Sequence, residues 1–212
     1  MLSPSTPAGS LSGVTTAARP YHHGNLREAL LRAGERALEA GGARDLSLRE
    51  LAREVGVSHA APRRHFADKR ALLDALAESG FDQFGARLAA ASEAAGADFD
   101  ARLRGLAHAY VAFAGEHPAL MELMFAAKHD TDASPRLRAA GERAFAPAIV
   151  AVAEGQTSGA VVGGDPERVA LIASAALQGL IAMTRNGMLG DASLDGLLDE
   201  AIERLVLGLR PR

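Results

Sequence analysis

The chain has 212 residues, no cysteine and a formal net charge of −3, and it is 48% hydrophobic, 23% charged and 4% aromatic. This apolar content excludes a disordered chain, and the lack of cysteine excludes a disulfide scaffold, thiolate catalysis and Cys-ligated zinc or iron–sulfur. The longest apolar stretch, 169–183, is shorter than the ~18 residues of a membrane span. Residues 1–18 contain no Lys or Arg, unlike a secretory signal. We therefore expect a cytoplasmic protein with no membrane segment and interpret residues 1–20 as a disordered extension.

Two helices are predicted at the start of the folded part. An apolar stripe with helical spacing predicts a first helix from about Leu26, stopped by the glycines at 41–42. Ser47 then begins a short second helix. Glu50 lies three residues further on, which is the spacing of a capping box. Gly56 ends this helix, because glycine takes the positive φ that a tight turn needs.

A third and a fourth helix are predicted immediately after that turn. Ser58 is the expected N-cap of a third, short helix that runs to Phe66, and Asp68 is the expected cap of a fourth. The second and third helices, separated by Gly56 and Val57, have the arrangement of a helix–turn–helix. The sequence therefore predicts an N-terminal three-helix bundle that contains this motif.

Longer helices are expected beyond residue 96. The pairs Ser134–Pro135 and Asp165–Pro166 each combine a capping residue with proline at the first helical position, and Pro118 begins another helix. Pro147 should kink or divide the helix in which it lies. The last helix is expected to start at Ser193. Strand signals are nearly absent, so the predicted fold is all-α, with a larger helical C-terminal domain.

The charges of the two parts differ in sign. From residue 19 to residue 70 there are 11 Lys and Arg against seven Asp and Glu, whereas from residue 71 onwards there are 12 against 19. A basic N-terminal part favours contact with a polyanion. In a helix–turn–helix the second helix presents its early residues to the major groove, where all four base pairs can be distinguished. Ala60 and Ala61 are small enough for close approach, and His59, Arg63 and Arg64 lie beside them.

Two motifs in this part resemble a known family. The runs LRELAREVGVS (48–58) and RHFADKRALL (64–73) are similar to the DNA-binding domain of the TetR family of transcriptional regulators. The resemblance is specific over about residues 25–85, and beyond that it is architectural. It implies a DNA-binding domain over 21–85 and a helical effector-binding and dimerisation domain over 86–212. In that family the last two helices commonly form the dimer interface.

The resemblance also implies roles for single residues. Ser47, His65 and Lys69 match positions that contact the DNA backbone. Two positions depart from the family pattern: Arg63 stands where the family often has Tyr, and Pro62 lies inside the expected recognition helix. An Arg at this position can reach phosphate or read a guanine. The implied DNA-binding residues are Ser47, His59, Ala60, Ala61, Arg63, Arg64, His65 and Lys69.

The C-terminal domain is expected to hold an effector pocket. Its aromatic and Met side chains are more typical of a plain hydrophobic core than of a ligand wall. Some relatives carry Trp and His before a glycine in the penultimate helix, whereas here Ser174 and Gln178 precede Gly179, so no ligand follows from the resemblance. The candidate pocket residues are His108, Tyr110, Phe113, His117, Met121, Met124, Phe125, Phe145 and Gln178.

The leading hypothesis is a ligand-responsive transcriptional repressor. It would bind a pseudo-palindromic operator in double-stranded DNA as a homodimer and would be released by a small-molecule effector. We expect no cofactor and no metal site, since His22 and His23 are adjacent residues in an expected flexible arm. One alternative is a helical enzyme, for which no G-x-S-x-G, H-E-x-x-H or Walker motif is found. Another is a non-specific architectural DNA-binding protein, which the acidic remainder of the chain disfavours.

Overall fold

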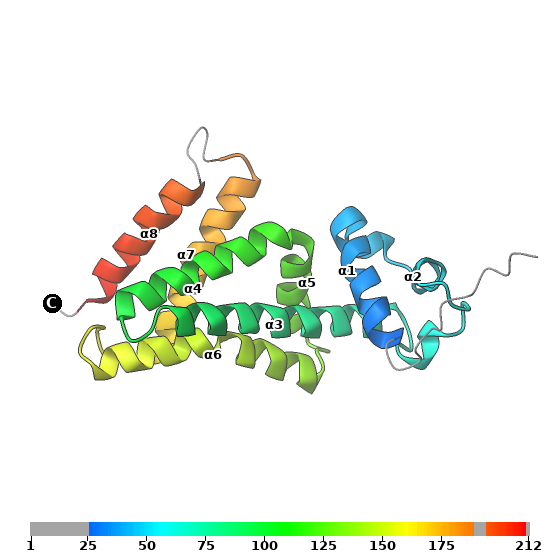
Figure 1. Ribbon diagram of the computed structural model, residues 1–212, viewed down its shortest axis with the longest axis horizontal. Helices are drawn as coiled ribbons and strands as arrows, with labels where there is room; N and C mark the ends of the chain where they lie inside the picture. Colours follow the sequence, from blue (N-terminus) through cyan, green and yellow to red (C-terminus); the bar gives the residue numbers. More distant parts are fainter. Residues whose placement is uncertain (1–25, 189–193, 211–212) are drawn as a thin grey trace, which may run out of the picture.

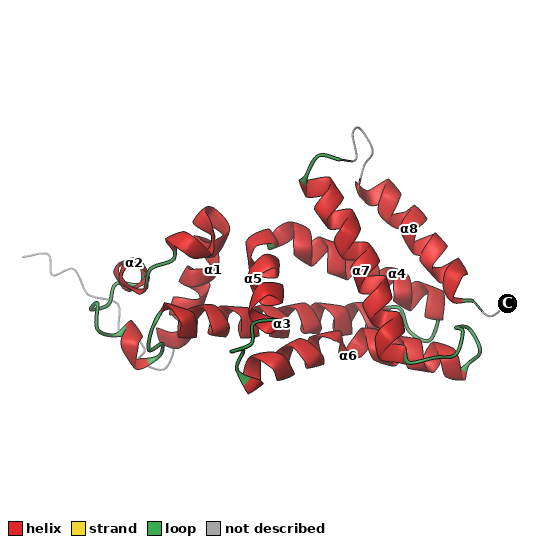
Figure 2. Cartoon of the chain, turned by 180° about the vertical axis from the view of Figure 1, so that it is seen from behind, coloured by secondary structure: helices red, strands yellow, loops and turns green. Residues whose placement is uncertain are grey.

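The structure is a computed structural model that describes residues 26–188 and 194–210. Over these residues the chain is all-α, as predicted, with no strand (Figure 2). The helices are α1 (Leu26–Asp45), α2 (Leu48–Glu54), the 3-10 helix η2 (Pro62–Arg64), α3 (Lys69–Ala94), α4 (Phe99–Glu116), α5 (Pro118–Lys128), α6 (Pro135–Thr157), α7 (Pro166–Arg185) and α8 (Leu194–Leu209).

Helix α3 runs along the length of the molecule and organises the other helices (Figure 1). At one end α1, α2 and η2 pack around its beginning, and we call this group the head. At the other end α4 and α6 lie against α3, and α7 and α8 pack on α4 and on each other. Helix α5 lies between the head and this larger body, in contact with both α1 and α3. The predicted order of a small N-terminal bundle and a larger helical part is confirmed.

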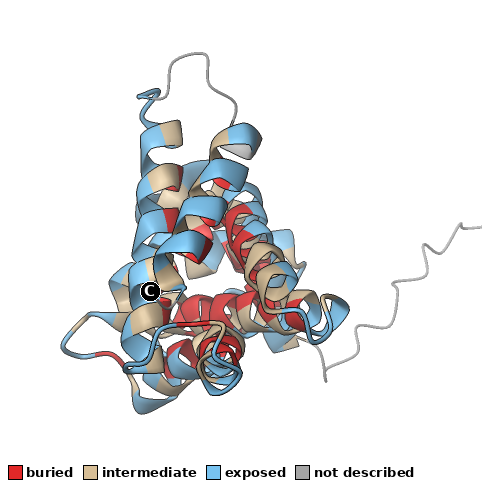
Figure 3. Cartoon of the chain, turned by 90° about the vertical axis from the view of Figure 1, so that its left-hand side faces the viewer, coloured by how far each residue is buried: buried red, intermediate tan, exposed pale blue. Residues whose placement is uncertain are grey.

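The hydrophobic core is continuous from the head into the body. Buried residues lie on the helix faces that turn toward one another, and exposed residues cover the outside (Figure 3). In the body, Phe84 on α3 is fully buried. Its ring centroid lies 5.2 Å from those of Tyr110 and Phe113 and 5.5 Å from that of Phe145. Edge-on and tilted rings at these distances are the favourable aromatic arrangements.

Several helices begin where the sequence predicts. The side chain of Asp68 accepts a hydrogen bond from the backbone N–H of Ala71 at 2.8 Å. Ser134 and Asp165 cap α6 and α7 in the same way, and in both helices proline follows at the first position. These side chains satisfy amides that the first helical turn leaves without partners.

Helix α5 is capped from another part of the chain. His117 is its N-cap residue but makes no side-chain capping bond. Instead, the carboxylate of Glu39 on α1 accepts the backbone N–H of Ala119 at 3.1 Å and that of Leu120 at 2.9 Å. Beside it, Nδ1 of His117 lies 3.4 Å from Oε1 of Glu35. Polar contacts therefore fix the head to the body, a role that local spacing in the sequence does not reveal.

Of two local predictions in the head, one is confirmed and one is wrong. The first helix breaks at Gly42, as predicted, because this residue has φ 75° and ψ 174°, and a short second helical piece then continues to Asp45. The capping box at Ser47 does not form, because the Ser47 side chain makes no capping hydrogen bond. Ser47 instead takes an extended conformation, and its carbonyl accepts the N–H of Leu51 at 3.0 Å.

Two predictions concern the later helices. Pro147 lies inside α6 without dividing it, because the missing N–H removes only one intrahelical bond. Ser193 lies outside the described residues, and α8 begins at the next residue, Leu194.

The expected domain boundary between residues 85 and 86 falls within α3, which is continuous from Lys69 to Ala94.

Among the described helices, α7 alone is long and apolar enough to cross a membrane by length and composition. Only Ala170, Leu177 and Ile181 in it are buried. Charged residues stand at its ends, with Glu167 in the first turn and Arg185 in the last. One such helix packed on its neighbours in a helical protein is weak evidence for a membrane span.

Candidate functional site

The segment expected to be a recognition helix is a turn followed by η2. The carbonyl of Ser58 accepts the N–H of Ala61 at 3.0 Å, three residues on. An α-helix capped at Ser58 would use the N–H of the next residue, Pro62, which proline lacks. The prediction of a regular helix from Ser58 to Phe66 is therefore wrong. The chain forms one tight turn and then places Pro62 at the first position of the 3-10 helix, where no N–H is needed.

Two buried side chains hold this segment against the head. Pro62 is buried and Phe66 is 2% exposed. The backbone N–H groups of His65 and Phe66 both donate to the carbonyl of Pro62 at 2.9 Å, which closes the turn between the two anchors. The guanidinium of Arg27 lies 5.8 Å from the centre of the Phe66 ring, a cation–π contact. Before the segment, Gly56 adopts φ 76°, the conformation expected from its place in the turn.

The other side chains of the segment form an exposed polar edge. His59, Ala60, Arg63, Arg64 and His65 are exposed, and Ala61 is partly exposed. The His65 ring touches Phe66 only at a centroid distance of 6.5 Å and is otherwise open to solvent. Six of the eight predicted DNA-binding residues therefore lie in this short segment and are exposed or partly exposed, with two guanidinium groups among them.

The remaining two residues lie outside this segment. Ser47 is half-buried at the start of α2. The ammonium of Lys69 donates to the backbone carbonyl of Arg44 at 2.6 Å. Lys69 thus ties the end of α1 to the beginning of α3, which the sequence analysis missed because the bond joins residues 25 positions apart. Arg49 and Arg53 on α2 are also exposed and extend the basic surface.

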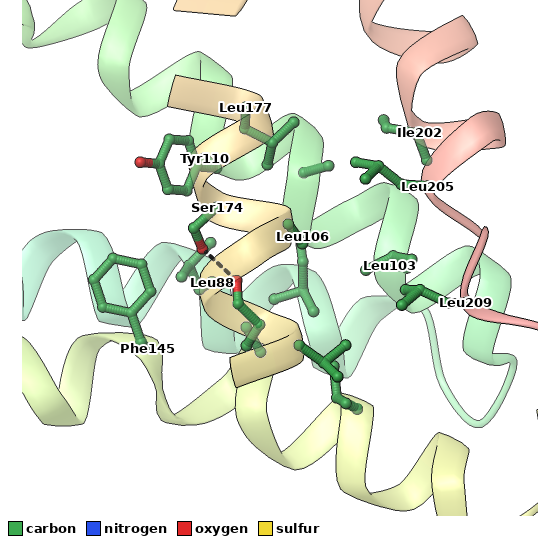
Figure 4. Close-up of a pocket in the computed structure, with 16 residues that line it drawn as sticks. Leu88, Leu103, Leu106, Tyr110, Phe145, Ser174, Leu177, Ile202, Leu205 and Leu209 are labelled. Atoms are coloured by element: carbon green, nitrogen blue, oxygen red, sulfur yellow. Dashed lines mark hydrogen bonds between the residues drawn. The ribbon is translucent and has the colours of Figure 1, made fainter. Parts of the chain in front are cut away.

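A second candidate site is a cavity of about 40 Å³ in the body (Figure 4). It lies between α3, α4, α6, α7 and α8, and its wall is almost entirely hydrocarbon. The lining residues are Leu88, Leu103, Leu106, Ala107, Tyr110, Phe145, Ala148, Val152, Val169, Ala170, Ala173, Ser174, Leu177, Ile202, Leu205 and Leu209.

Three of the nine predicted pocket residues are found at this cavity. Tyr110 and Phe145 line it. Gln178 adjoins it, because its side-chain oxygen accepts the Tyr110 hydroxyl at 2.9 Å. Burial raises the pKa of Tyr110, so its hydroxyl stays protonated and acts as a donor.

The other six are not among the lining residues. Phe113, Met121 and Met124 are buried in the main core, and Phe125 packs on Phe81 and Phe145. His108 lies on the surface, where its Nε2 is 3.1 Å from Asp199. His117 belongs to the contact between head and body described above. Most of the predicted bulky residues fill the core, whereas the cavity wall consists mainly of Leu, Val and Ala, with Tyr110 and Phe145 among them.

Metal binding finds no support in the described residues, which contain no cluster of three His, Asp or Glu suited to a metal ion. His22 and His23 lie outside those residues.

Comparison with known proteins gives two family matches. Residues 30–76 match the bacterial regulatory proteins of the tetR family, and residues 103–209 match the tetracyclin repressor-like C-terminal domain. The second match alone covers half of the chain. A search of functionally curated proteins finds no match.

Solved structures show the same fold over nearly the whole chain. A protein of unknown function from Rhodococcus sp. RHA1 is 44% identical, with a TM-score of 0.85, over 92% of this chain and 100% of that one. A TetR family regulator from Marinobacter aquaeolei VT8 is 22% identical, with a TM-score of 0.72, over 89% and 97% of the two chains. The TetR family regulator PfmR from Thermus thermophilus is 19% identical, with a TM-score of 0.65, over 86% and 99%.

Proposed function

The chain belongs to the TetR family and is thus a DNA-binding transcriptional regulator and not an enzyme, and from this premise we propose that it is a repressor. It acts as a homodimer on a pseudo-palindromic operator in double-stranded DNA and leaves it when a small-molecule effector binds. The DNA-binding part comprises residues 21–85, and the effector-binding and dimerisation part comprises residues 86–212. The protein works in the cytoplasm, where its operator DNA is found.

The observation that carries this proposal is the exposed edge between Ser58 and His65. Arg63, Arg64 and His65 are free of ion pairs among the described residues and open to solvent. His59 and the small Ala60 precede them on the same surface, so the backbone can come close to base edges. The guanidinium groups suit phosphates or guanine, and Arg binds both in bidentate fashion. In a dimer, two such edges would lie about one helical turn apart, at ~34 Å or slightly more.

Exposed hydrocarbon supports the proposed dimer. Leu171 and Ile172 on α7 are 68% and 66% exposed, and Leu207 on α8 is 66% exposed. Large apolar side chains grouped on the surface mark sites of protein contact. A second copy that presents the same two helices would cover them in a two-fold symmetric interface. This placement also accounts for the apolar composition of α7 without a membrane.

The test is binding of the protein to a labelled DNA duplex from the region upstream of the coding sequence, measured by fluorescence anisotropy. Arg64→Ala should weaken binding at least tenfold and reduce the steepness of its salt dependence, because one fewer phosphate-bound counterion is released. Arg143→Ala on α6 is the matched control, since it also removes one exposed arginine but lies in the body. Wild-type affinity of Arg64→Ala at physiological salt would contradict the assignment of this edge.

The dimer is tested separately. The double variant Leu171→Lys, Ile172→Lys should sediment as a monomer and lose operator affinity while its helical content is unchanged. A dimer that persists in this variant would place the interface elsewhere.

A further inference from the structure

The cavity wall contains no charged side chain. Polar side-chain atoms come only from Tyr110 and Ser174, and both hydroxyls already donate to partners in the protein. The Ser174 hydroxyl donates to the carbonyl of Ala170 at 2.9 Å, the dashed line in Figure 4, and the Tyr110 hydroxyl donates to Gln178. What these two oxygens still offer is their lone pairs. The cavity can therefore accept a hydrogen bond from a ligand but has little to give to one.

Charge in a ligand would be unfavourable here. An ion transferred from water into a hydrocarbon cavity without a counter-charge loses several kcal/mol of hydration free energy. Since the wall supplies neither a counter-charge nor a free donor, carboxylates, phosphates and sulfonates are disfavoured. Ammonium groups also find no anion in the wall.

On the basis of the effector-responsive function proposed above, we infer that this cavity is the effector site and takes an uncharged, largely apolar molecule. The molecule carries at most one hydrogen-bond donor, which faces the oxygen of Tyr110 or Ser174. Its apolar part lies against the leucines of α4 and α8.

The cavity must widen before an effector can enter, since its volume of about 40 Å³ is enough for only a few water molecules. The wall that can move is α8, which contributes Ile202, Leu205 and Leu209 (Figure 4). Apart from these apolar contacts, the end of α8 is held by a backbone hydrogen bond, in which the N–H of Val162 donates to the carbonyl of Leu209 at 2.7 Å, and by the exposed ion pair Arg210–Asp100 at 2.8 Å. Nε2 of His108 on α4 also lies 3.1 Å from the carboxylate of Asp199 on α8. Exposed pairs of this kind stabilise little, so a ligand that fills the space can compensate for their loss.

The position of the cavity links the ligand to the head. Leu88 in its wall belongs to α3, whose first residue, Lys69, is bonded to the head. Other wall residues belong to α7 and α8, the helices of the proposed dimer interface. A ligand that prefers the widened cavity therefore also prefers one arrangement of α3 relative to α7 and α8, and this differential affinity is what shifts the population.

The test uses two probes with the same aromatic frame on the full-length chain. N-phenyl-1-naphthylamine is uncharged and has one N–H donor, whereas 1-anilinonaphthalene-8-sulfonate carries an additional sulfonate. Fluorescence titration should give a dissociation constant at least tenfold lower for the uncharged probe. Equal or tighter binding of the sulfonate would overturn the inference.

Cavity-filling variants locate the bound probe. Ala173→Phe should weaken binding of the uncharged probe at least tenfold, and Leu205→Phe should do the same from the opposite wall. Ala126→Phe, at an exposed position on α5, is the control and should bind like the wild type. Circular dichroism identifies any variant that fails to fold. If one filling variant fails to fold, binding of the probe to the other filling variant tests the site. Unchanged binding in a folded filling variant would overturn the site.

Operator retention by the wild-type chain without probe separates this inference from the repressor proposal. Failure to retain DNA counts against the repressor, whatever the probes do. Retained DNA together with a wild-type preference for the charged probe counts against the inference alone.

Discussion

The head and the body expose opposite kinds of side chain. At the head, the outermost residues are His59, Arg63, Arg64 and His65, which remain hydrated until a polyanion replaces water. On the body, Leu171, Ile172 and Leu207 face solvent although burial would favour them by roughly 1.5–3 kcal/mol each. The contrast fits two partners of different chemistry on one chain: DNA at the head and, as proposed above, a second copy of the chain at the body.

The two regions also differ in how firmly they are packed. The turn that carries the polar edge is held by two buried side chains, Pro62 and Phe66. In the body, Phe84 alone contacts three other rings. Loss of a single anchor should therefore disable the head while the body stays folded.

The largest expected effect is that of Phe66→Ala. Loss of a buried Phe side chain costs about 3–5 kcal/mol, and here the cost falls on the turn that presents the arginines. We expect loss of operator retention, while the sedimentation coefficient stays equal to that of the wild type. The control is Phe125→Ala on α5, where the side chain is partly buried against the core, and this variant should lower stability and leave the polar edge intact. Wild-type operator affinity in Phe66→Ala would show that the packing contrast is wrong.

A smaller effect is expected for Gly85→Ala in the body. A Cβ atom at this position would lie 2.9 Å from Cα of Ala144 on α6, so backbone must shift. Overpacking of this kind costs typically ~1–3 kcal/mol. Gly115→Ala on α4 is the matched substitution, because nothing lies within 4 Å of its added Cβ. It should stabilise the helix by about 0.5–1 kcal/mol. Thermal melts of both variants measure the difference, and a melting temperature above wild type for Gly85→Ala would contradict the close helix crossing.

The smallest effect is expected at the contact between the two regions. Glu39→Gln keeps the shape of the side chain but removes the charge that caps α5. The loss should be about 0.5–2 kcal/mol of unfolding free energy, as for other N-terminal caps. Glu142→Gln, at an exposed position of α6, is the control and should be near neutral in the same urea titration. Equal stability of the two variants would mean that Glu39 does not couple head and body.

Local chemistry explains which parts of the fold the sequence predicts. Asp68, Ser134 and Asp165 act within three residues of their own position, so their capping roles are visible in a short window. Ser58 does not begin a regular helix, and the reason is also local: Pro62, four residues on, lacks the N–H that would bond to the Ser58 carbonyl. The Glu39 cap and the Lys69 bond join residues distant in sequence, and no local pattern reveals them.

The cavity could be predicted only in part. The aromatic character of Tyr110 and Phe145 predicts them for the cavity, yet Phe113 is also aromatic and lies in the core, as does the large apolar Met124. Whether a Leu or Ala lines a void depends on how well the neighbouring helices fit, and this is a property of the three-dimensional packing alone. The polar edge of the head is easier to predict from the sequence, since the exposure of Arg63 and Arg64 follows from their charge.

The length of helix α3 makes it a lever between the cavity and the head. Its 26 residues make a rigid rod about 39 Å long at ~1.5 Å per residue, with the head at one end and Leu88 near the other. Leu88 and Lys69 on α3 are about 29 Å apart at ~1.5 Å per residue, so a tilt of about 5° about Leu88 would displace Lys69 by about 2.5 Å. In the proposed dimer this displacement would occur in both subunits, so a small tilt of α3 at the cavity would change the separation of the two heads on the duplex.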